Sequence, residues 1–446
     1  MSEWKKVKIG DISEYKKEFI VIDDDIEYKR CRVQLHQRGI VLRDKINGSA
    51  IKTKKQRLCK SGDFIVAEMD AKFGGYGIIP DNLHDAIVSS HYYLFKLEKT
   101  KISIDYMNAL LETNIIQSQI KARGTTNYSS IRPKNVLNYE IPLPNMNTQL
   151  KIVHLFNQHK KTHISLSSEI TNQQTLLKKL HQAILQEAIQ GKLTVDWRKK
   201  NPDVEPASEL LKRIQAEKET LIAEKKIKKQ KPLPPIKAEE IPFGLPKGWV
   251  WCRLGELVES YQNGISKRGG GNGVDIVVLR LADIKNYSIY FDNTRSLTLD
   301  TKELDKFKIE DDDILVTRVN GSVDIVGNFN YCNNISLKNI TYCDHLIRMR
   351  VFFKEIIASY LFFVEKTFLI REQVKSKFKT TAGQKTINQG HLSNFFIPLP
   401  PLPEQKAIVA KVEKLLAHCD QLEQQINQSQ TNSQQLMQAV LREAFE

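Results

Sequence analysis

Hydrophobic residues recur at alternating spacings of four and three along two stretches of the chain. In the C-terminal stretch they fall at Ile408, Val412, Leu415, Cys419, Leu422, Ile426, Leu436 and Val440. The middle of the chain carries a matching series at Ile152, Phe156, Leu166, Ile170, Leu177, Leu180 and Ile184. Such heptad spacing predicts two long helices, each with a narrow apolar seam. We predict that the seams cover each other as an antiparallel coiled coil; the alternative is that each helix packs only on its own domain.

Both seams belong to an internal repeat. The segment YEIPLPNMNTQLKIV from Tyr139 aligns without a gap to FFIPLPPLPEQKAIV from Phe395, an offset of 256 residues, and the register continues for about fifty residues. The prolines bias the residues before them toward extended geometry, so each IPLP predicts the end of a strand and the entry into a helix. Because Thr148 stands where the second copy has Glu404, we expect a less sharply defined start for the first helix.

The domains in front of these helices match less closely. WKKVKIGDI (4–12) resembles WVWCRLGEL (249–257), and KSGDFIVAE (60–68) resembles EDDDILVTR (310–318). β-Branched segments such as DIVVLRLADI and DDILVTRV predict strands, whereas IDYMNALLETNIIQSQI and IIASYLFFVEKTFLIREQV predict helices. The predicted fold class is therefore α+β, with two tandem mixed α/β domains separated and followed by long helices. The expected boundaries are 1–144 and 247–400 for the domains, 145–192 and 401–446 for the long helices, and 193–246 for a linker.

The linker is rich in charge. Pro206 followed by a run of Glu, Leu and Lys to about Gln230 predicts a short charged helix, and PLPPI (232–236) predicts a stiff extended connector. We expect this segment to pack rather than to hang free.

Composition narrows the class of protein. A chain of 446 residues with 41% hydrophobic residues is long enough for two or more cores. Its formal net charge of +15 favours a polyanionic partner, with nucleic acid ahead of an anionic membrane surface. Without a long apolar run or a signal-like start, we expect a soluble cytoplasmic protein. Six scattered cysteines without a CxxC pair predict free thiols and no metal site.

Several basic stretches are candidates for DNA contact. Residues 29–60 hold eleven Lys or Arg and one acid, Asp44, and alternate basic with apolar positions, as suits strands with one face on phosphates. Two Thr-, Asn- and Gln-containing basic loops precede the two IPLP segments, and a glycine-rich loop (263–273) is a weaker candidate because simple flexibility explains it equally well. The candidate DNA-binding residues are Lys29, Arg30, Arg32, Gln34, Gln37, Arg38, Lys54, Lys55, Arg57, Arg123, Thr125, Asn127, Lys267, Arg268, Arg318, Asn320, Lys375, Lys377, Lys379, Gln384 and Lys385.

Catalytic signatures are missing from the sequence. It contains no GxxxxGK[ST] phosphate loop, no HExxH and no NPP-aromatic tetrapeptide. Asp203 with Glu224 and Lys226 forms one nuclease-like pattern, in a charged linker where composition alone produces it. We predict no catalytic and no metal-binding residues, and keep two alternatives to DNA recognition: a stand-alone nuclease, and a coiled-coil scaffold that binds proteins.

The two IPLP segments, GKLTVDWRKKNPDVEPASELLKRIQAEKETLI (191–222) and LPKGWVWCRLGEL (245–257) together resemble the specificity subunit of type I restriction-modification systems, over essentially the whole chain. The resemblance implies two target-recognition domains that each read half of a bipartite DNA site. It implies helices that dock two methyltransferase subunits and, through them, restriction subunits. It places S-adenosylmethionine, ATP and Mg²⁺ in those partners and no cofactor in this chain. The family's variable recognition loops transfer no residue by motif.

The helix length fits such a site. From Ile408 to Val440 an α-helix rises about 48 Å, against about 34 to 36 Å for one turn of duplex DNA. Helices of this length can space two readers by one to one and a half turns. Because the helices match in strict register while the domains do not, we expect an asymmetric DNA site.

Overall fold

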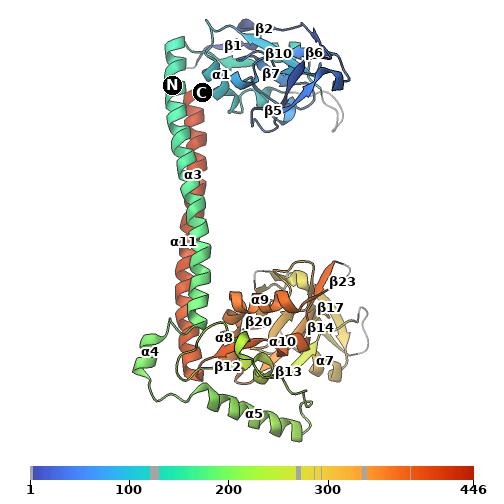
Figure 1. Ribbon diagram of the computed structural model, residues 1–446, viewed down its shortest axis with the longest axis vertical. Helices are drawn as coiled ribbons and strands as arrows, with labels where there is room; N and C mark the ends of the chain where they lie inside the picture. Colours follow the sequence, from blue (N-terminus) through green and yellow to red (C-terminus); the bar gives the residue numbers. More distant parts are fainter. Residues whose placement is uncertain are drawn as a thin grey trace. The chain divides into compact units, whose positions relative to one another are not determined.

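The computed structural model describes residues 4–120, 130–267, 273–285, 287–292, 294–333, 339–381 and 383–445. The chain divides into two compact units, the first formed by residues 1–172 with 426–446 and the second by residues 173–425. Each unit therefore combines one mixed domain with one half of each long helix (Figure 1).

The first unit is mainly β-structure with short helices. Its strands are β1 (Lys6–Lys8), β2 (Ser13–Tyr15), β3 (Ile20–Val21), β4 (Glu27–Val33), β5 (Ile40–Asn47), β6 (Lys55–Leu58), β7 (Phe64–Ala67), β8 (Tyr76–Ile78), β9 (Ile87–Val88), β10 (Tyr92–Leu97) and β11 (Glu140–Pro142). Its helices are α1 (Ile104–Leu111), α2 (Pro133–Leu137), the first part of α3 (Met146–Ile189) and the last part of α11 (Leu402–Phe445).

The second unit has more elements. Its strands are β12 (Val250–Arg253), β13 (Val258–Asn263), β14 (Val274–Leu279), β15 (Ile284–Lys285), β16 (Ser288–Ile289), β17 (Arg295–Leu299), β18 (Ile314–Thr317), β19 (Val319–Asn320), β20 (Phe329–Tyr331), β21 (Ile340–Tyr342), β22 (Leu346–Val351), β23 (Lys379–Thr381), β24 (Gln384–Thr386) and β25 (Phe396–Leu399). Besides its parts of α3 and α11, its helices are α4 (Val195–Lys200), α5 (Ala207–Ala223), α6 (Leu254–Leu257), α7 (Thr301–Phe307), α8 (Lys354–Glu365), α9 (Phe368–Lys377) and α10 (Gln389–Ser393).

One sheet is common to both domains. The first domain has a four-stranded sheet in the order β2-β10-β7-β8, and the second has β13-β22-β18-β20. All the neighbouring strands are antiparallel. The matched segments 60–68 and 310–318 supply β7 and β18, the third strand of each sheet. Entry strand and IPLP strand also pair in both domains, as β1 with β11 and β12 with β25. The structure thus confirms the predicted α+β class and the upstream half of the repeat.

The same side chains close this frame in both domains. Gln119 exchanges two hydrogen bonds with the backbone of Glu140 (2.7 and 2.8 Å), and Gln373 does so with Phe396 (2.9 Å each). The helices also end alike: the hydroxyls of Thr113 and Thr367 each donate to the backbone three residues earlier. These breaks explain why the two segments predicted as continuous helices form α1 with a short turn, and α8 followed by α9.

The second sheet differs between the domains. The first domain adds a five-stranded sheet in the order β3-β6-β9-β4-β5. The second domain instead carries the three small sheets β17-β14-β21, β15-β16 and β19-β24-β23. A shared scaffold therefore supports two unrelated surfaces.

In each unit, one half of α3 packs beside the opposite half of α11, so the two helices run antiparallel as predicted (Figure 1). In the first unit Ile152, Val153 and Phe156 share a core with Phe445, against which Met437 and Leu441 also pack.

Among the described residues, no helix combines the length and the apolar character that a membrane span requires.

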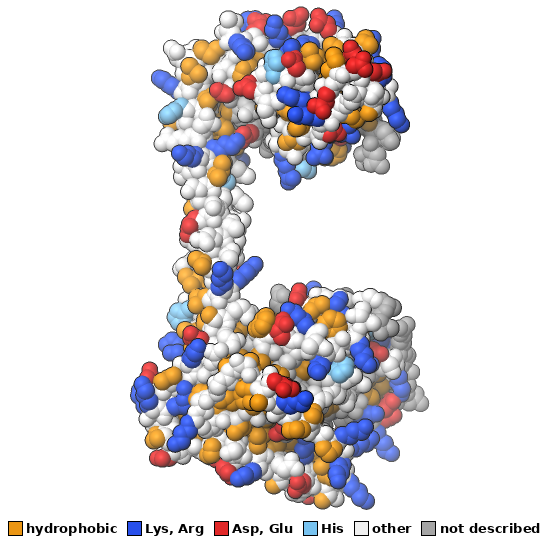
Figure 2. Space-filling model, in the orientation of Figure 1, with side chains coloured by type: hydrophobic (Ala, Val, Ile, Leu, Met, Phe, Trp, Pro, Cys, Tyr) orange, Lys and Arg blue, Asp and Glu red, His pale blue; other side chains and the backbone are white. Residues whose placement is uncertain are grey.

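One row of each predicted seam is covered along its length, whereas the second row is covered only near the start of each helix. Buried or half-buried residues recur every seven positions at Phe156, His163, Ile170, Leu177 and Ile184, and at Val412, Cys419, Ile426, Ser433 and Val440. Farther along the helices the prediction that the second row is covered is wrong. Leu166, Leu180, Leu422 and Leu436 are 40%, 44%, 45% and 61% exposed. Two helices without further partners cover one edge of a seam this wide, so the other edge stays open. Figure 2 shows hydrophobic side chains at the surface of the long helices α3 and α11. Of the other predicted seam residues, Ile152 and Ile408 are buried and Leu415 is half-buried.

The start of α3 is well defined, contrary to our expectation. Asn145 Oδ1 accepts hydrogen bonds from the backbone nitrogen and the hydroxyl of Thr148, both at 3.0 Å. An asparagine in this place satisfies one of the free N–H groups of the first turn. Thr148 therefore supports the cap, and Glu404 at the equivalent position of α11 serves another purpose.

Glu404 lies at the centre of a buried polar cluster of the second unit. Its carboxylate accepts from Trp249 Nε1 (2.8 Å), from the hydroxyl of Thr194 (2.6 Å) and from Arg198. Arg198 also donates to the backbone oxygen of Gly191 (2.7 Å). The cluster joins the end of α3, the helix α4, the residue before β12 and the start of α11.

The linker packs, but its helix is shorter than predicted. Helix α5 ends at Ala223 because Lys225 adopts a left-handed conformation, with φ of 61°, and turns the chain. The following residues lie along the second domain, where Arg253 donates to the backbone oxygens of Pro234 and Pro235 at 3.1 Å each.

Candidate DNA interface

Four of the candidate residues of the first domain use their polar groups inside the domain. Arg30 pairs with Asp44 through two bonds of 2.7 Å, and Arg57 is buried, donating to Lys16 O (2.6 Å) and to the Tyr15 hydroxyl (2.8 Å). The amide of Gln37 donates to the Tyr76 hydroxyl (2.9 Å), and Lys54 pairs with Asp24. The pairing of Arg30 and Asp44 lowers the pKa of Asp44.

The other candidates of this domain lie at its surface. Arg32, on β4, and Arg38, in the β4–β5 turn, are exposed, and Gln34 beside that turn is half-buried. Lys55 is exposed and lies 5.0 Å from the centre of the Phe19 ring, and Lys29 donates to Asn82 O at 3.3 Å. Arg123, Thr125 and Asn127 lie outside the described residues. The basic surface thus centres on the β4–β5 hairpin.

The second domain brings four of its nine candidates onto one small sheet: Asn320, Lys379, Gln384 and Lys385. Antiparallel pairing places Asn320 opposite Lys385, and Thr381 opposite Gln384, in the sheet β19-β24-β23. Lys385 donates to Gly321 O at 2.7 Å, and Asn320 accepts from the backbone of Ser322 at 2.8 Å. Lys379 starts β23, while Lys375 and Lys377 end α9 just before it; Lys375 also pairs with Glu372 at 2.8 Å.

One turn joins the remaining candidates to this sheet. Arg318 donates to Asp344 O from its side chain (3.0 Å) and to His345 O from its backbone (2.8 Å). On the other side of the turn, Asp344 donates to Ile265 O (3.1 Å), two residues before Lys267. Lys267 itself pairs with Glu303, and Arg268 lies outside the described residues. No signal in the sequence pointed to this turn, because the candidates were chosen for Lys and Arg and the only basic residue of the turn is His345.

The two domains place different charges at one position of the common frame. Glu68 O accepts from Ile131 N (3.1 Å) in the first domain, and Arg318 O accepts from Ile387 N (2.9 Å) in the second. The backbone nitrogens of the same two residues bond to His91 O and His345 O. Glu68 and Arg318 are therefore equivalent in backbone and opposite in charge.

Different side chains also hold the loops that follow these positions. Arg371 binds the loop after β19 through Asn328 Oδ1 (2.9 Å), Val323 O (2.7 Å) and Val326 O (3.2 Å), and pairs with Glu365 at 2.9 Å. Burial raises the pKa of Glu365 to about 7. In the first domain Gln117 has this role, since it bonds to Lys72 O and accepts from the Tyr76 hydroxyl at 3.0 Å.

The nuclease alternative lacks a clustered site. Asp203 precedes α5 and Glu224 follows it, and the seventeen residues of that helix separate the two carboxylates by about 25 Å. Within the described residues, the only group with metal-ligand proximity is Cys343, Asp344 and His345. The six cysteines are free, and five are buried.

Comparison with known proteins agrees with this architecture. The family model of the type I restriction modification DNA specificity domain matches residues 1–175 and 246–430. The StySPI specificity subunit of a type I restriction enzyme from Salmonella potsdam is 31% identical over 346 residues, which are 77% of this chain. This chain covers 65% of the length of that relative.

Solved structures show a similar fold. The HsdS subunit from Thermoanaerobacter tengcongensis superposes with a TM-score of 0.59 at 19% identity, covering 100% of this chain and 97% of the other. A chain from a study of complex assembly and conformational transition in a type I R-M system gives 0.65 at 19% identity, covering 100% and 98%. With the family model matching both halves of its internal repeat, the chain belongs to the family of type I restriction-modification DNA specificity proteins.

Proposed function

We propose that this chain is the non-catalytic specificity subunit of a type I restriction-modification complex and reads a bipartite, asymmetric DNA site. The observation that carries the proposal is one sheet frame used twice with different surfaces, where Glu68 and Arg318 occupy the same backbone position. The common sheet holds the contact residues of each domain on the same scaffold. Because the side chains on that scaffold differ between the domains, each domain would recognise different base edges.

The proposed contacts are the candidates that remain at the surface. In the first domain these are Arg32, Gln34, Arg38, Lys55 and Lys29; Arg30, Arg57, Gln37 and Lys54 are better assigned to holding the sheet in shape. In the second domain we assign Arg318, Asn320, Gln384 and Lys385 to contacts with base edges or phosphates, and Lys267, Lys375, Lys377 and Lys379 to further phosphate contacts.

The open seam rows support docking of two identical methyltransferase subunits. Leu166 and Leu436 are exposed in the first unit, and their repeat equivalents Leu422 and Leu180 are exposed in the second. Exposed apolar rows of this kind mark protein interaction sites. Each unit offers the same pair of leucines, so two copies of one partner can bind alike. We propose that these partners supply S-adenosylmethionine, and that restriction subunits bound through them supply ATP and Mg²⁺ chemistry.

Exchanging residues 1–140 for the recognition domain of another specificity protein tests the proposal. Sequencing of methylated adenines in the host genome should show a new first half-site and an unchanged second one. Loss of this gene should remove the methylated motif altogether. A change in both half-sites would contradict modular reading, and equal binding of random and cognate duplexes at physiological salt would contradict DNA specificity.

Arg318→Ala should relax the second half-site only. A side chain that reads a base contributes about 1 to 3 kcal/mol of discrimination, or roughly 5- to 150-fold. Binding of duplexes mismatched in either half-site, measured in the assembled complex, gives the readout. Glu68→Ala is the matched control, since it should affect the first half-site alone. Uniform weakening across all sequences would instead assign Arg318 to a phosphate contact.

A further inference from the structure

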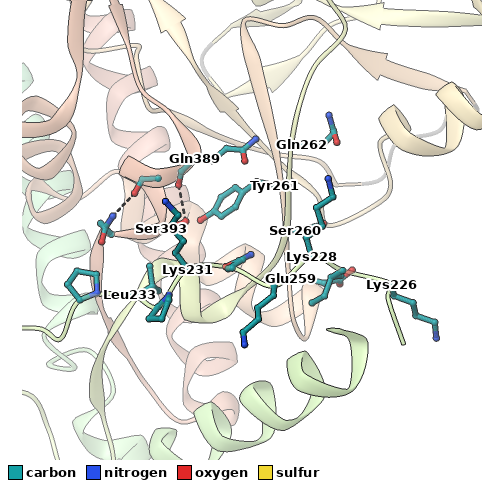
Figure 3. Close-up of a pocket in the computed structure, with 17 residues that line it drawn as sticks. Lys226, Lys228, Lys231, Leu233, Glu259, Ser260, Tyr261, Gln262, Gln389 and Ser393 are labelled. Atoms are coloured by element: carbon teal, nitrogen blue, oxygen red, sulfur yellow. Dashed lines mark hydrogen bonds between the residues drawn. The ribbon is translucent and has the colours of Figure 1, made fainter. Parts of the chain in front are cut away.

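A groove lies between the edge strand β13 and the residues that follow α5 (Figure 3). We call residues 225–231, with the sequence KKIKKQK, the lysine strap. The groove has a volume of about 780 Å³ and a wall on each side: the strap and the prolines after it, and Glu259–Gln262 with α10. This volume is in the range of clefts that bind ligands, roughly 300 to 1,000 Å³.

The wall formed by β13 is an unpaired sheet edge. In the order β13-β22-β18-β20, β13 is terminal, and among the described residues β22 is the one strand that pairs with it. The strap does not complete the sheet: the backbone nitrogens of residues 228–233 donate to no backbone oxygen in the described part of the chain. An unpaired edge is a template for a further strand.

The strap is held at both ends: at its start the backbone nitrogens of Lys226 and Ile227 donate to Leu221 O of α5 (2.9 and 3.4 Å), and its last residues are tied to the rest of the domain. Buried Lys218 donates to Gly255 O (2.9 Å) and to Gln230 Oε1 (3.3 Å), which ties the strap to α6. Beyond it, Arg253 binds Pro234 O and Pro235 O and pairs with Glu240 at 2.8 Å. The strap therefore spans the sheet edge without collapsing onto it.

The groove is positively charged and holds a buried tyrosine hydroxyl. Lys226, Lys228, Lys229 and Lys231 are exposed along the strap, where Lys226 pairs with Glu224 (2.8 Å), and the opposite wall carries the single acid Glu259. The hydroxyl of Tyr261 is buried and makes no hydrogen bond of normal geometry within the described residues, and the side chain that interacts with it is Ser393. Its neighbour Ser393 donates its own hydroxyl to Gln389 O at 2.9 Å, as Figure 3 shows. A buried hydroxyl of this kind is a donor available to a bound group.

We propose that this groove binds an extended acidic peptide segment of a partner protein, which adds to the free edge of β13. Main-chain hydrogen bonds to the edge provide affinity, as in other cases of strand addition. Alternate side chains of the peptide bring carboxylates to the strap lysines, and a peptide carbonyl accepts from Tyr261. An added strand lies about 4.8 Å from its neighbour, the spacing that main-chain hydrogen bonds to β13 require.

The test uses the full-length chain and a fluorescein-labelled ten-residue peptide of alternating glutamate and valine, with binding followed by anisotropy. We expect saturable binding that weakens at least tenfold in the variant K226Q/K228Q/K229Q/K231Q. The variant K199Q/K200Q/K302Q/K306Q removes the same charge from exposed lysines outside the groove and should bind as the unaltered chain does. A lysine–valine peptide should not bind.

Two further probes separate strand addition from simple charge attraction. A peptide methylated on every second backbone nitrogen, on the edge that would face β13, should lose at least tenfold in affinity, and Tyr261→Phe should weaken the unmethylated peptide. Equal binding of the methylated peptide would overturn strand addition. Displacement of the peptide by non-cognate duplex DNA, with equal loss of DNA binding in the strap variant, would assign the strap to DNA and overturn the proposal.

Discussion

Replacing Glu404 by alanine is expected to destabilise the second unit by about 3 to 5 kcal/mol, because the substitution leaves Arg198 without its anion and the buried donors of Trp249 and Thr194 without an acceptor. For a unit of this size, that corresponds to a fall in melting temperature of roughly 10 °C. Calorimetry of the full chain should show the shift in one of two unfolding transitions.

The repeat provides the control for this prediction. Thr148 occupies the equivalent position in α3, and within the described residues its hydroxyl bonds to the capping residue Asn145 alone. Thr148→Ala should therefore cost about 1 kcal/mol or less. Glu404→Gln keeps the shape of the side chain, so its loss of unfolding free energy should lie between those of Glu404→Ala and Thr148→Ala. Equal effects of Glu404→Ala and Thr148→Ala would mean that the cluster contributes no more than a helix start.

Arg371→Ala is the second change with a large expected effect. The substitution leaves Glu365, which is fully buried, without its ion-pair partner and frees the loop at Val323, Val326 and Asn328. We expect a loss of about 3 to 5 kcal/mol in unfolding free energy. Because the loop begins directly after Asn320, recognition of the second half-site should weaken while the first is unchanged. Gln117→Ala, the equivalent change in the first domain, leaves no charge behind and should cost about 1 kcal/mol.

The pH dependence of the unfolding free energy tests the contribution of Glu365. Burial raises its pKa from the ordinary value of 4.5 to about 7, against the opposing effects of Arg371 and Lys366. An acid whose pKa is higher in the folded chain destabilises the fold as it ionises, so stability should fall by up to about 3 kcal/mol between pH 4.5 and 7. Lys366, whose pKa burial lowers to about 8, titrates above this window.

Urea unfolding at pH 5, 6, 7 and 8 measures this fall. Glu365→Gln should remove it, since glutamine does not titrate, and Arg371→Ala should extend it to higher pH because the carboxylate loses its nearest cation. An unchanged profile in Glu365→Gln would assign the pH dependence to other groups.

Much of the architecture could be predicted from local pattern. The heptad spacing and the offset of 256 residues established two long helices and a tandem repeat, since periodicity and proline placement act over a few residues. Likewise, the resemblance of residues 60–68 to 310–318 identified the equivalent strands β7 and β18. Basic composition indicated a polyanionic partner but did not distinguish one lysine or arginine from another.

The tertiary structure decided which of these residues are free to act. Arg30, Arg57 and Gln37 resemble DNA contacts in sequence, yet partners distant in the chain occupy their polar groups: Asp44, Tyr15 and Tyr76. The second row of each apolar seam is open beyond the start of its helix, because the width that a helix pair can bury depends on how close the helices come. Local sequence determines what a residue can bond to, and the fold determines whether that bond is already made.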